Sequence, residues 1–269
     1  MIKAILFDYG GVYGGEGFSA LLRRLARISG RSYETVFNLG FKKICIEDGF
    51  VKGKVTEDYF WHKILKGLNI PPDKVDIDQL REYMYKQFKP RKYMEKLVDN
   101  LRSSHAVGLL SDQTRWLDEL DRRYNIYSHF DYLFLSFKIG LSKHDPEIFD
   151  YACRKMSVQP SEVFFIDDNA DNIRVAKTRG LVGHVYKDYD TLVKRMRELG
   201  ILKNPVREKK KIPLEEALKP YIKDLEEALE QRHPSPVLYF DGISYRLRLL
   251  KNYIQKIQER YGFEIFEDS

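Results

Sequence analysis

Short apolar runs recur along the first two hundred residues, each bounded by polar or turn residues and followed by a stretch with helical periodicity. The runs are Ile2–Phe7, Ala106–Leu110, Tyr132–Ser136, Val163–Ile166 and Val182–Tyr186. Continuous apolar runs of this length are typical of parallel strands, because helices bury both faces of a parallel sheet. The pattern therefore predicts an α/β fold with a doubly wound parallel sheet.

A long segment separates the first two predicted strands. From Phe18 to about Tyr93 the sequence reads mostly as helix, and Pro71-Pro72 and Pro90 interrupt it. We expect a separate helical subdomain, inserted at about residues 15–91, that stands over the sheet.

The composition changes after a helix predicted at Tyr189–Leu199, in the segment KNPVREKKKIP. We interpret this segment as a linker, which divides the chain into a core of residues 1–203 and a C-terminal helical extension of residues 204–269. An amphipathic stripe runs from Ile243 to Tyr261 with spacings of four and three. Such helices must dock on the chain's own core or on another chain, so a homodimer through them is one of two predictions.

Composition narrows the classes of partner and compartment. The net charge of +6 is spread over mixed-sign stretches, which favours anionic small-molecule substrates over nucleic acid. Cys45 and Cys153 are too few and too far apart for a disulfide framework or a zinc site. The start MIKAILFD lacks a secretory pattern, and no stretch approaches the ~20 apolar residues of a membrane span. We expect a soluble, cytoplasmic protein.

The segment FDYGGVYGGEG, residues 7–17, raises the question of nucleotide binding. Gly10 and Gly15 have the spacing of a phosphate-binding loop, but Glu16 stands where that loop needs lysine, and a dinucleotide fingerprint lacks its third glycine at Ala20. Asp8 instead falls at the carboxyl end of the first strand, the end that faces the ligand crevice in open α/β sheets. An acid followed by glycines on a tight turn indicates a nucleophile or a metal ligand.

The other strand ends carry matching chemistry. Ser111 lies in GLLSDQT, Lys143 lies in GLSKHDPEIF, and Asp167 and Asp168 lie in VFFIDDNADN. Together with Asp8 these acids would repel one another unless a hard divalent cation bound them, and Mg²⁺ prefers oxygen ligands. The sequence thus predicts a magnesium site at one edge of the sheet.

These four segments in this order resemble the motifs of the haloacid dehalogenase superfamily, and the resemblance covers about residues 1–200. FDYGGV is similar to the first motif, LLSDQ to the second, SKHDPEIF to the third and FFIDDNADN to the fourth. The resemblance implies a Rossmann-like core with a helical cap inserted after the first strand. The branch of small-molecule phosphatases that holds a glucose-1-phosphate phosphatase and the soluble epoxide hydrolase phosphatase domain is the most similar, and GKVTEDYFW in the cap matches it.

The resemblance also implies residue roles. Asp8 would be the nucleophile that forms a phospho-aspartate, with Ser111 and Lys143 as its catalytic partners. The positions around the phosphate would be Ser111, Asp112 and Lys143. The Mg²⁺ ligands would be the side chains of Asp8 and Asp168, the backbone carbonyl of Gly10, and Asp167 through water.

Three positions depart from the family pattern. Gly10 stands where an aspartate usually serves as general acid and base, Asp112 stands where this branch has asparagine, and His144 replaces a proline. Loss of such an acid costs ~10²–10⁴ in rate when the leaving group needs a proton. Anomeric sugar, acyl and aryl phosphates would suffer less, and Glu16, Tyr9 or a metal-held water could substitute for the acid.

The sequence therefore predicts a Mg²⁺-dependent phosphatase of a small-molecule phosphomonoester, with a sugar phosphate among the candidates. The alternative is a weak or inactive relative that serves as a binding or oligomerisation module, and a dehalogenase is a third reading. For individual residues, Ser111, Asp167 and Asp168 could instead cap helices, and Lys143 could be a surface lysine. Trp61 and Trp116 are predicted to be core residues.

Overall fold

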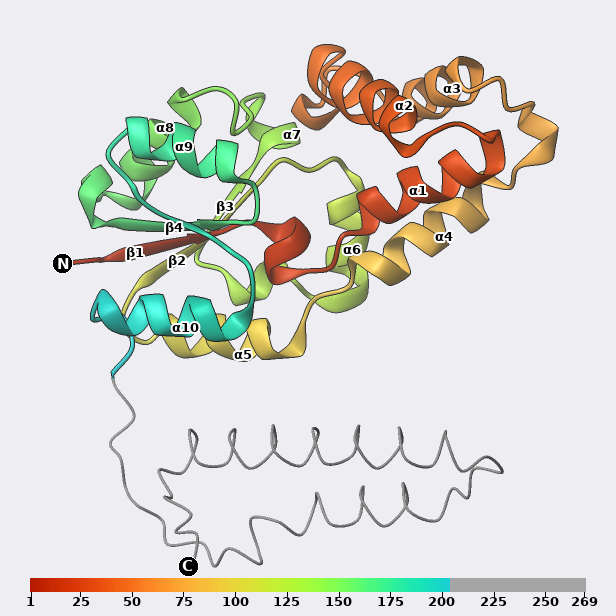
Figure 1. Cartoon of the computed structure of the whole chain (residues 1–269). Coiled ribbons are helices and arrows are strands. Elements are labelled where there is room, and N and C mark those ends of the chain that lie inside the picture. The colour runs from red at the N-terminus through yellow and green to blue at the C-terminus, as the bar shows by residue number, and fades with distance from the viewer. Residues whose placement is uncertain (204–269) are drawn as a thin grey trace, which may run out of the picture. The chain divides into compact units, whose positions relative to one another are not determined.

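The computed structural model describes residues 1–203. The predicted C-terminal helices, and the homodimer expected through them, lie outside these residues. Five parallel strands form one sheet in the order β3-β2-β1-β4-β5 (Figure 1). The strands are β1 (Ala4–Phe7), β2 (Ala106–Ser111), β3 (Tyr132–Leu135), β4 (Val163–Asp167) and β5 (Val182–Val185). The predicted α/β fold with a parallel sheet is confirmed.

The register of the central strands places the predicted site residues together. Phe7 at the end of β1 pairs with Leu109 of β2 on one side and with Ile166 of β4 on the other. Because the strands are parallel, the residues that follow these pairs emerge at the same edge of the sheet. Asp8 and Asp167 therefore become neighbours although they are far apart in the sequence.

Helices cover both faces of the sheet, as the apolar runs require. Successive residues of β1 alternate between the faces: Leu6 packs with α8 (Glu147–Met156) and α9 (Ala170–Thr178), whereas Phe7 belongs to the cluster that includes α5 (Lys92–Leu101) and α10 (Tyr189–Glu198). Figure 1 shows these two pairs of helices on opposite sides of the strands. Two shorter helices, α6 (Trp116–Tyr124) and α7 (Ser136–Ile139), complete this sheet domain.

A helical insertion follows β1 and lies to the right of the sheet in Figure 1. Its helices are α1 (Gly17–Ser29), α2 (Tyr33–Phe37), α3 (Glu57–Gly67) and α4 (Ile77–Phe88). A π-helical segment, η2 (Asn38–Glu47), and short 3-10 turns, η3 (Phe50–Lys52) and η4 (Pro72–Lys74), connect them. Side-chain oxygens of Thr56 and Asp76 accept hydrogen bonds at the starts of α3 and α4, which explains where these helices begin. Short 3-10 turns also occur in the sheet domain at Tyr127–His129 and Pro160–Glu162.

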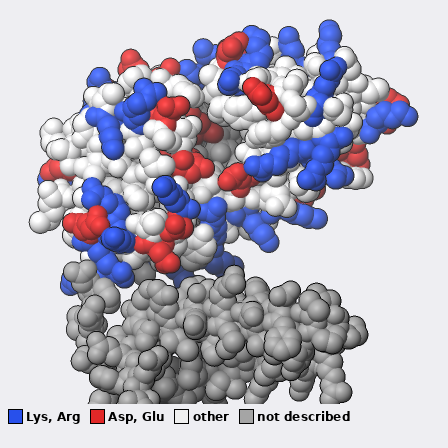
Figure 2. Space-filling view, viewed as in Figure 1, with Lys and Arg blue, Asp and Glu red and all other residues white. Residues whose placement is uncertain are grey.

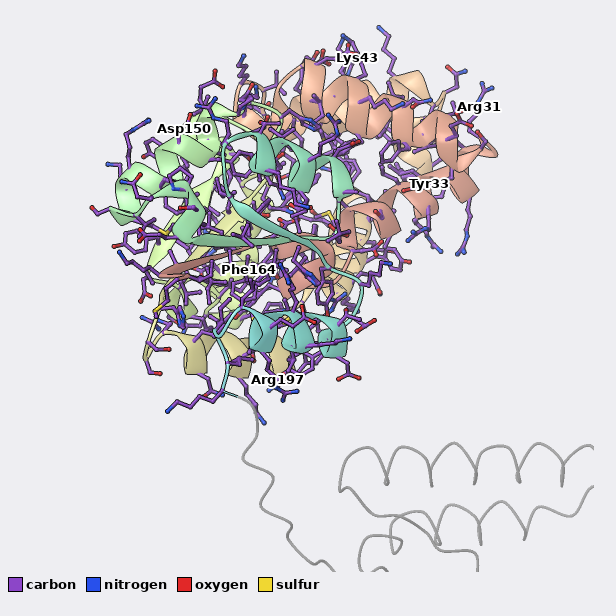
Figure 3. The ribbon with its side chains drawn as sticks, turned by 60° about the vertical axis from the view of Figure 1, so that its left-hand side comes forward. Arg31, Tyr33, Lys43, Asp150, Phe164 and Arg197 are labelled. Atoms are coloured by element: carbon purple, nitrogen blue, oxygen red, sulfur yellow. The ribbon has the colours of Figure 1, made fainter. Side chains whose placement is uncertain are left out.

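The side chains separate into a buried interior and a charged exterior. Figure 3 shows Phe164 of β4 inside the sheet domain, whereas Asp150 and Arg197 lie on the outer helices α8 and α10. Cys45 and Cys153 are buried free thiols. Among the described residues, no helix has the length and apolar character needed to cross a membrane.

Replacement of Phe164 by alanine tests this description of the core. Phe164 is fully buried, so Phe164→Ala should lower the free energy of unfolding by about 3–5 kcal/mol through lost apolar contacts and a residual cavity. Leu133 of β3 is 39% exposed, and Leu133→Ala should change stability by only about 0.5 kcal/mol. Urea denaturation of both variants checks the contrast, and equal losses would contradict it.

Candidate active site

A glycine-rich turn after β1 sets the geometry of the site. The turn is a five-residue π-type segment, η1 (Tyr9–Tyr13), and the side chain of Asp8 accepts a hydrogen bond from the Tyr9 amide at its start. Gly11 has a φ of +73°, and a Cβ there would lie 2.1 Å from Oδ2 of Asp168. Only glycine therefore lets the Asp168 carboxylate approach this backbone.

The later glycines serve the connection to the insertion. A Cβ at Gly15 would lie 2.0 Å from the carbonyl oxygen of Gln87, so the chain segments that enter and leave the insertion pass each other closely. Tyr9 stabilises the same crossing, because its buried hydroxyl donates to the Phe88 carbonyl at 2.6 Å. That bond commits the Tyr9 proton to the backbone and removes Tyr9 as a substitute acid.

Asp8, Ser111 and Lys143 are in direct contact. Ser111 Oγ donates to Asp8 Oδ1 at 2.6 Å, and Lys143 Nζ lies 2.9 Å from the same oxygen. All hydrogen bonds found for this carboxylate within residues 1–203 fall on Oδ1, including the one from the Tyr9 amide. One carboxylate oxygen is therefore anchored, and Oδ2 is left available for chemistry.

Asp167 is fully buried at the end of β4 and holds the Lys143 ammonium in place. Its carboxylate accepts from Lys143 Nζ at 2.6 Å, from the Asn169 amide at 2.8 Å, and from Nδ2 of Asn172 at 3.1 Å to both oxygens. Asn172 was not predicted from the sequence. The sequence signal that could have identified it is its position: Asn172 is a polar residue on the helical face that also carries Ile173 and Ala176, which are buried against the sheet.

Three carboxylates crowd one small volume. One oxygen from each of Asp8, Asp167 and Asp168 lies within 4.8 Å of the others. Burial raises the pKa of Asp8 to about 7 against the attraction of Lys143, and the charges of Asp167 and Asp168 raise it further. Asp168 is exposed at the rim, yet partial desolvation and then Asp167 also raise the pKa of its carboxyl. Such a cluster of oxygen donors fits a hard divalent cation.

Lys143 is the cation among these acids. It is 2% exposed, which excludes the surface alternative. Burial by itself lowers the pKa of its ammonium, but Asp167, Asp8 and Asp112 outweigh that effect and raise it, so Lys143 stays charged. Asp112 accepts from the Lys143 backbone amide at 2.9 Å and 3.1 Å to its two oxygens. Asp112 thus orders the loop that carries Lys143.

The residues that cap α6 and α9 are not the ones that the sequence offered as possible caps, namely Ser111, Asp167 and Asp168. Asn169 caps α9 by accepting from the Asp171 amide, and α6 begins after Arg115. Ser111, Asp167 and Asp168 therefore do not serve as these caps. Trp61 and Trp116 are both 3% exposed, which confirms them as core residues, although Trp116 also lines the cavity described next.

A cavity of about 290 Å³ opens over these residues, between the sheet domain and the insertion. Figure 2 shows the molecule hollowed at this place, with acidic side chains beside the hollow. Asp8, Gly10, Asp112, Lys143 and Asp168 all line it. His144 and Glu16 line it as well, and both are exposed. The structure thus brings most of the sequence-predicted residues to one cavity, whereas the fully buried Ser111 and Asp167 are not among the residues that line it.

Comparison with known proteins identifies the family. Residues 2–180 match the family model of the haloacid dehalogenase-like hydrolases. The chain belongs to this family.

Individual relatives are more distant. The chain is 25% identical over 189 residues to D-ribitol-5-phosphate phosphatase of Bacteroides thetaiotaomicron, which covers 67% of this chain and 89% of that protein. It is 24% identical to flavin mononucleotide hydrolase 1 of Arabidopsis thaliana, over 56% of this chain and 61% of that protein. It is 28% identical to bifunctional epoxide hydrolase 2 of Rattus norvegicus, over 31% of this chain and 16% of that protein. The chain thus spans less than two thirds of the length of the latter two proteins.

A solved structure shares the fold. A haloacid dehalogenase family enzyme of Bacteroides thetaiotaomicron in complex with magnesium and inorganic phosphate has a TM-score of 0.55 and 22% identity, and covers 71% of this chain and 99% of that chain.

Neighbouring glycines give a matched test of the turn. Gly11→Ala should destabilise the protein by about 1–3 kcal/mol, because alanine is strained at this φ and its Cβ meets Asp168. Gly10 has a φ of −65°, and a Cβ there would lie 3.6 Å from Gln113 Nε2, so Gly10→Ala should change stability by about 0.5 kcal/mol or less. Urea denaturation in EDTA measures both, and equal effects would refute the role of Gly11.

The raised pKa of Asp8 predicts a pH dependence of stability. Between pH 4 and about 7 the folded protein holds a proton on Asp8 that the unfolded chain releases, so this group destabilises the fold as the pH rises. In EDTA, the free energy of unfolding of Asp8→Asn minus that of the wild type should increase across this window. A difference that stays constant from pH 4 to 8 would show that Asp8 is not perturbed.

Proposed function

We propose that this protein is a Mg²⁺-dependent phosphatase that hydrolyses a small-molecule phosphomonoester through a phospho-aspartate on Asp8. The observation that carries the proposal is the contact of Ser111 and Lys143 with one oxygen of a buried carboxylate whose other oxygen is left available. The phosphatase names among the relatives support the same reaction class.

The residues of the chain supply the first step. The available oxygen of Asp8 attacks phosphorus, the bond between phosphorus and the ester oxygen breaks, and the leaving group departs with the bonding electrons. We infer that the Ser111 hydroxyl and the Lys143 ammonium, which both contact Asp8 Oδ1, bind the phosphoryl oxygens once substrate is present. Because phosphoryl transfer depends mainly on positioning and charge neutralisation, these two contacts are the main catalytic contribution of the chain.

The donor set fits Mg²⁺. Asp8 and Asp168 offer carboxylate oxygens, and the Gly10 carbonyl lies on the intervening turn. Both oxygens of Asp167 already accept hydrogen bonds, which favours a role for Asp167 through water. When bound, the cation would neutralise carboxylate repulsion and the charge of the phosphate.

The second step returns the enzyme to its starting state. Water attacks the phosphorus of the phospho-aspartate, and the bond between phosphorus and the Asp8 oxygen breaks with its electrons left on the carboxylate. Inorganic phosphate leaves and carries the protons of the water. No acid side chain stands at Gly10 to donate a proton to the leaving group or to accept one from water. That absence favours the alternative of a weak or inactive binding module, and turnover measurements separate the two.

Substitution of Asp8 tests the proposal. The wild-type protein should hydrolyse an activated aryl phosphate with Mg²⁺ and lose that activity in EDTA. Asp8→Asn should lower kcat by at least ~10⁴-fold, because an amide cannot form the phospho-enzyme. Asp171→Asn removes an exposed carboxylate on α9 and should leave kcat unchanged.

A broad panel of phosphate esters decides between the two functions. Absence of turnover across the panel with Mg²⁺, for a protein that circular dichroism shows to be folded, would favour the inactive binding module.

A further inference from the structure

We propose that the substrate is an aryl phosphomonoester, in which the aromatic ring itself carries the ester oxygen. This inference rests on the proposed function and specifies its substrate class. Two independent features of the cavity point to it: the rings that form its walls and the missing acid at Gly10.

Aromatic side chains form a continuous wall of the cavity. Phe37 stacks on Phe41 with ring centroids 5.1 Å apart, Phe41 contacts Phe18 at 6.4 Å, and Phe18 contacts Trp116 at 6.2 Å. All four rings line the cavity, and Phe18, Phe37 and Phe41 are only partly buried. A ring bound there would cover apolar surface that is now exposed and would make aromatic contacts.

The same wall offers little to a polyol. From the insertion, Ser19 is the only neutral polar residue that lines the cavity, whereas the other lining residues from α1, α2 and η2 are apolar. Other polar residues that line the cavity, among them Gln113, Thr114 and Asn169, come from the sheet domain. Hydroxyl groups of a sugar that face the aromatic rings would therefore lack partners, which is unfavourable.

A further ring lies beside the reaction centre. Phe88 lines the cavity, and its Cε1 lies 3.8 Å from the place that a Cβ on Gly10 would occupy. The position of the missing acid is therefore next to a ring. This proximity favours an ester whose ring begins at the phosphate oxygen over one with a long alkyl spacer.

The absence of an acid at Gly10 selects for a good leaving group. Lys143 is paired with Asp8 and Asp167, and Asp112 is held by a backbone amide. Glu16 and His144 also line the cavity, but both are exposed, and nothing in the structure holds either one against Asp8. A phenolate needs no proton to leave, because the pKa of a phenol is about 10, whereas an alkoxide is far more basic. The backbone at Gly10 would accept a side chain, so a restored acid can be tested directly.

Four esters separate the two features in the presence of Mg²⁺. Phenyl phosphate combines an aromatic ring with a good leaving group, and 2-phenylethyl phosphate has the ring but a poor leaving group. Glucose 1-phosphate has an anomeric leaving group but no aromatic ring, and glucose 6-phosphate has neither feature. We expect the highest kcat/KM for phenyl phosphate, a kcat at least ~10²-fold lower for 2-phenylethyl phosphate, and a KM at least ~10-fold higher for glucose 1-phosphate. A kcat/KM for glucose 1-phosphate equal to that for phenyl phosphate would overturn the inference.

Variants assign each effect to its residue. The readout is the ratio of kcat for 2-phenylethyl phosphate to kcat for phenyl phosphate. This ratio should be ~10²-fold higher in Gly10→Asp than in Gly10→Asn, whose side chain has the same shape but cannot donate a proton as an acid. Phe41→Leu should raise the KM for phenyl phosphate several-fold. Tyr151→Leu replaces a half-buried ring on α8 outside the cavity and should not. Equal effects of Phe41→Leu and Tyr151→Leu would contradict the aromatic wall.

A binding measurement keeps this inference separable from the proposed function. Calorimetry with Mg²⁺ should show benzylphosphonate binding at least ~10-fold more tightly than methylphosphonate. Equal affinities would overturn the aromatic preference whether or not any ester is hydrolysed. Absence of all turnover with that preference intact would count against the hydrolase reaction and not against the aromatic specificity.

Discussion

The confinement of several negative charges around one buried ammonium is the constraint on which this structure depends. Asp8 and Asp167 are held by Lys143 at 2.9 and 2.6 Å, and Asp112 fixes the backbone of the same lysine. Breaking such a buried pair by removal of one partner is strongly destabilising, because it leaves an uncompensated charge. The fold tolerates the cluster because Ser111 and backbone amides share the remaining charge. What is left over is an excess of carboxylate that a divalent cation can neutralise.

The sheet makes this confinement geometrically simple. Parallel strands end at one edge, so residues from widely separated parts of the chain converge without long loops. The turn after β1 then uses Gly11 to bring Asp168 against the backbone, which no other residue type would allow at that distance. The helical insertion encloses the result on its open side. The charged residues of the candidate site thus come mostly from the sheet domain, whereas the apolar walls of the cavity come mostly from the insertion.

The cavity relates the absence of an acid at Gly10 to the kind of substrate that the site would accept. The local backbone would accept a side chain, so nothing in the fold requires glycine there for space. The ring of Phe88 stands beside this position and also lines the cavity. Charge neutralisation at one end and an apolar surface at the other are separate requirements on a substrate, and a single aryl ester meets both.

The sequence by itself determined the elements and the positions that meet in the candidate site. Buried apolar runs identify strands to within one or two residues, since burial on both faces leaves a local signature, and polar residues that follow those runs mark the edge of the sheet at which the candidate site lies. Only the tertiary structure decided which hydrogen bonds form at this edge. Asn172 donates to Asp167, and Asp112 accepts from the Lys143 amide. The Tyr9 hydroxyl donates to the Phe88 carbonyl. The aromatic wall likewise could not be read beforehand, because core and cavity residues have the same apolar periodicity. Core residues and cavity residues differ in which residues from distant parts of the sequence pack against them. That difference is decided by the tertiary structure.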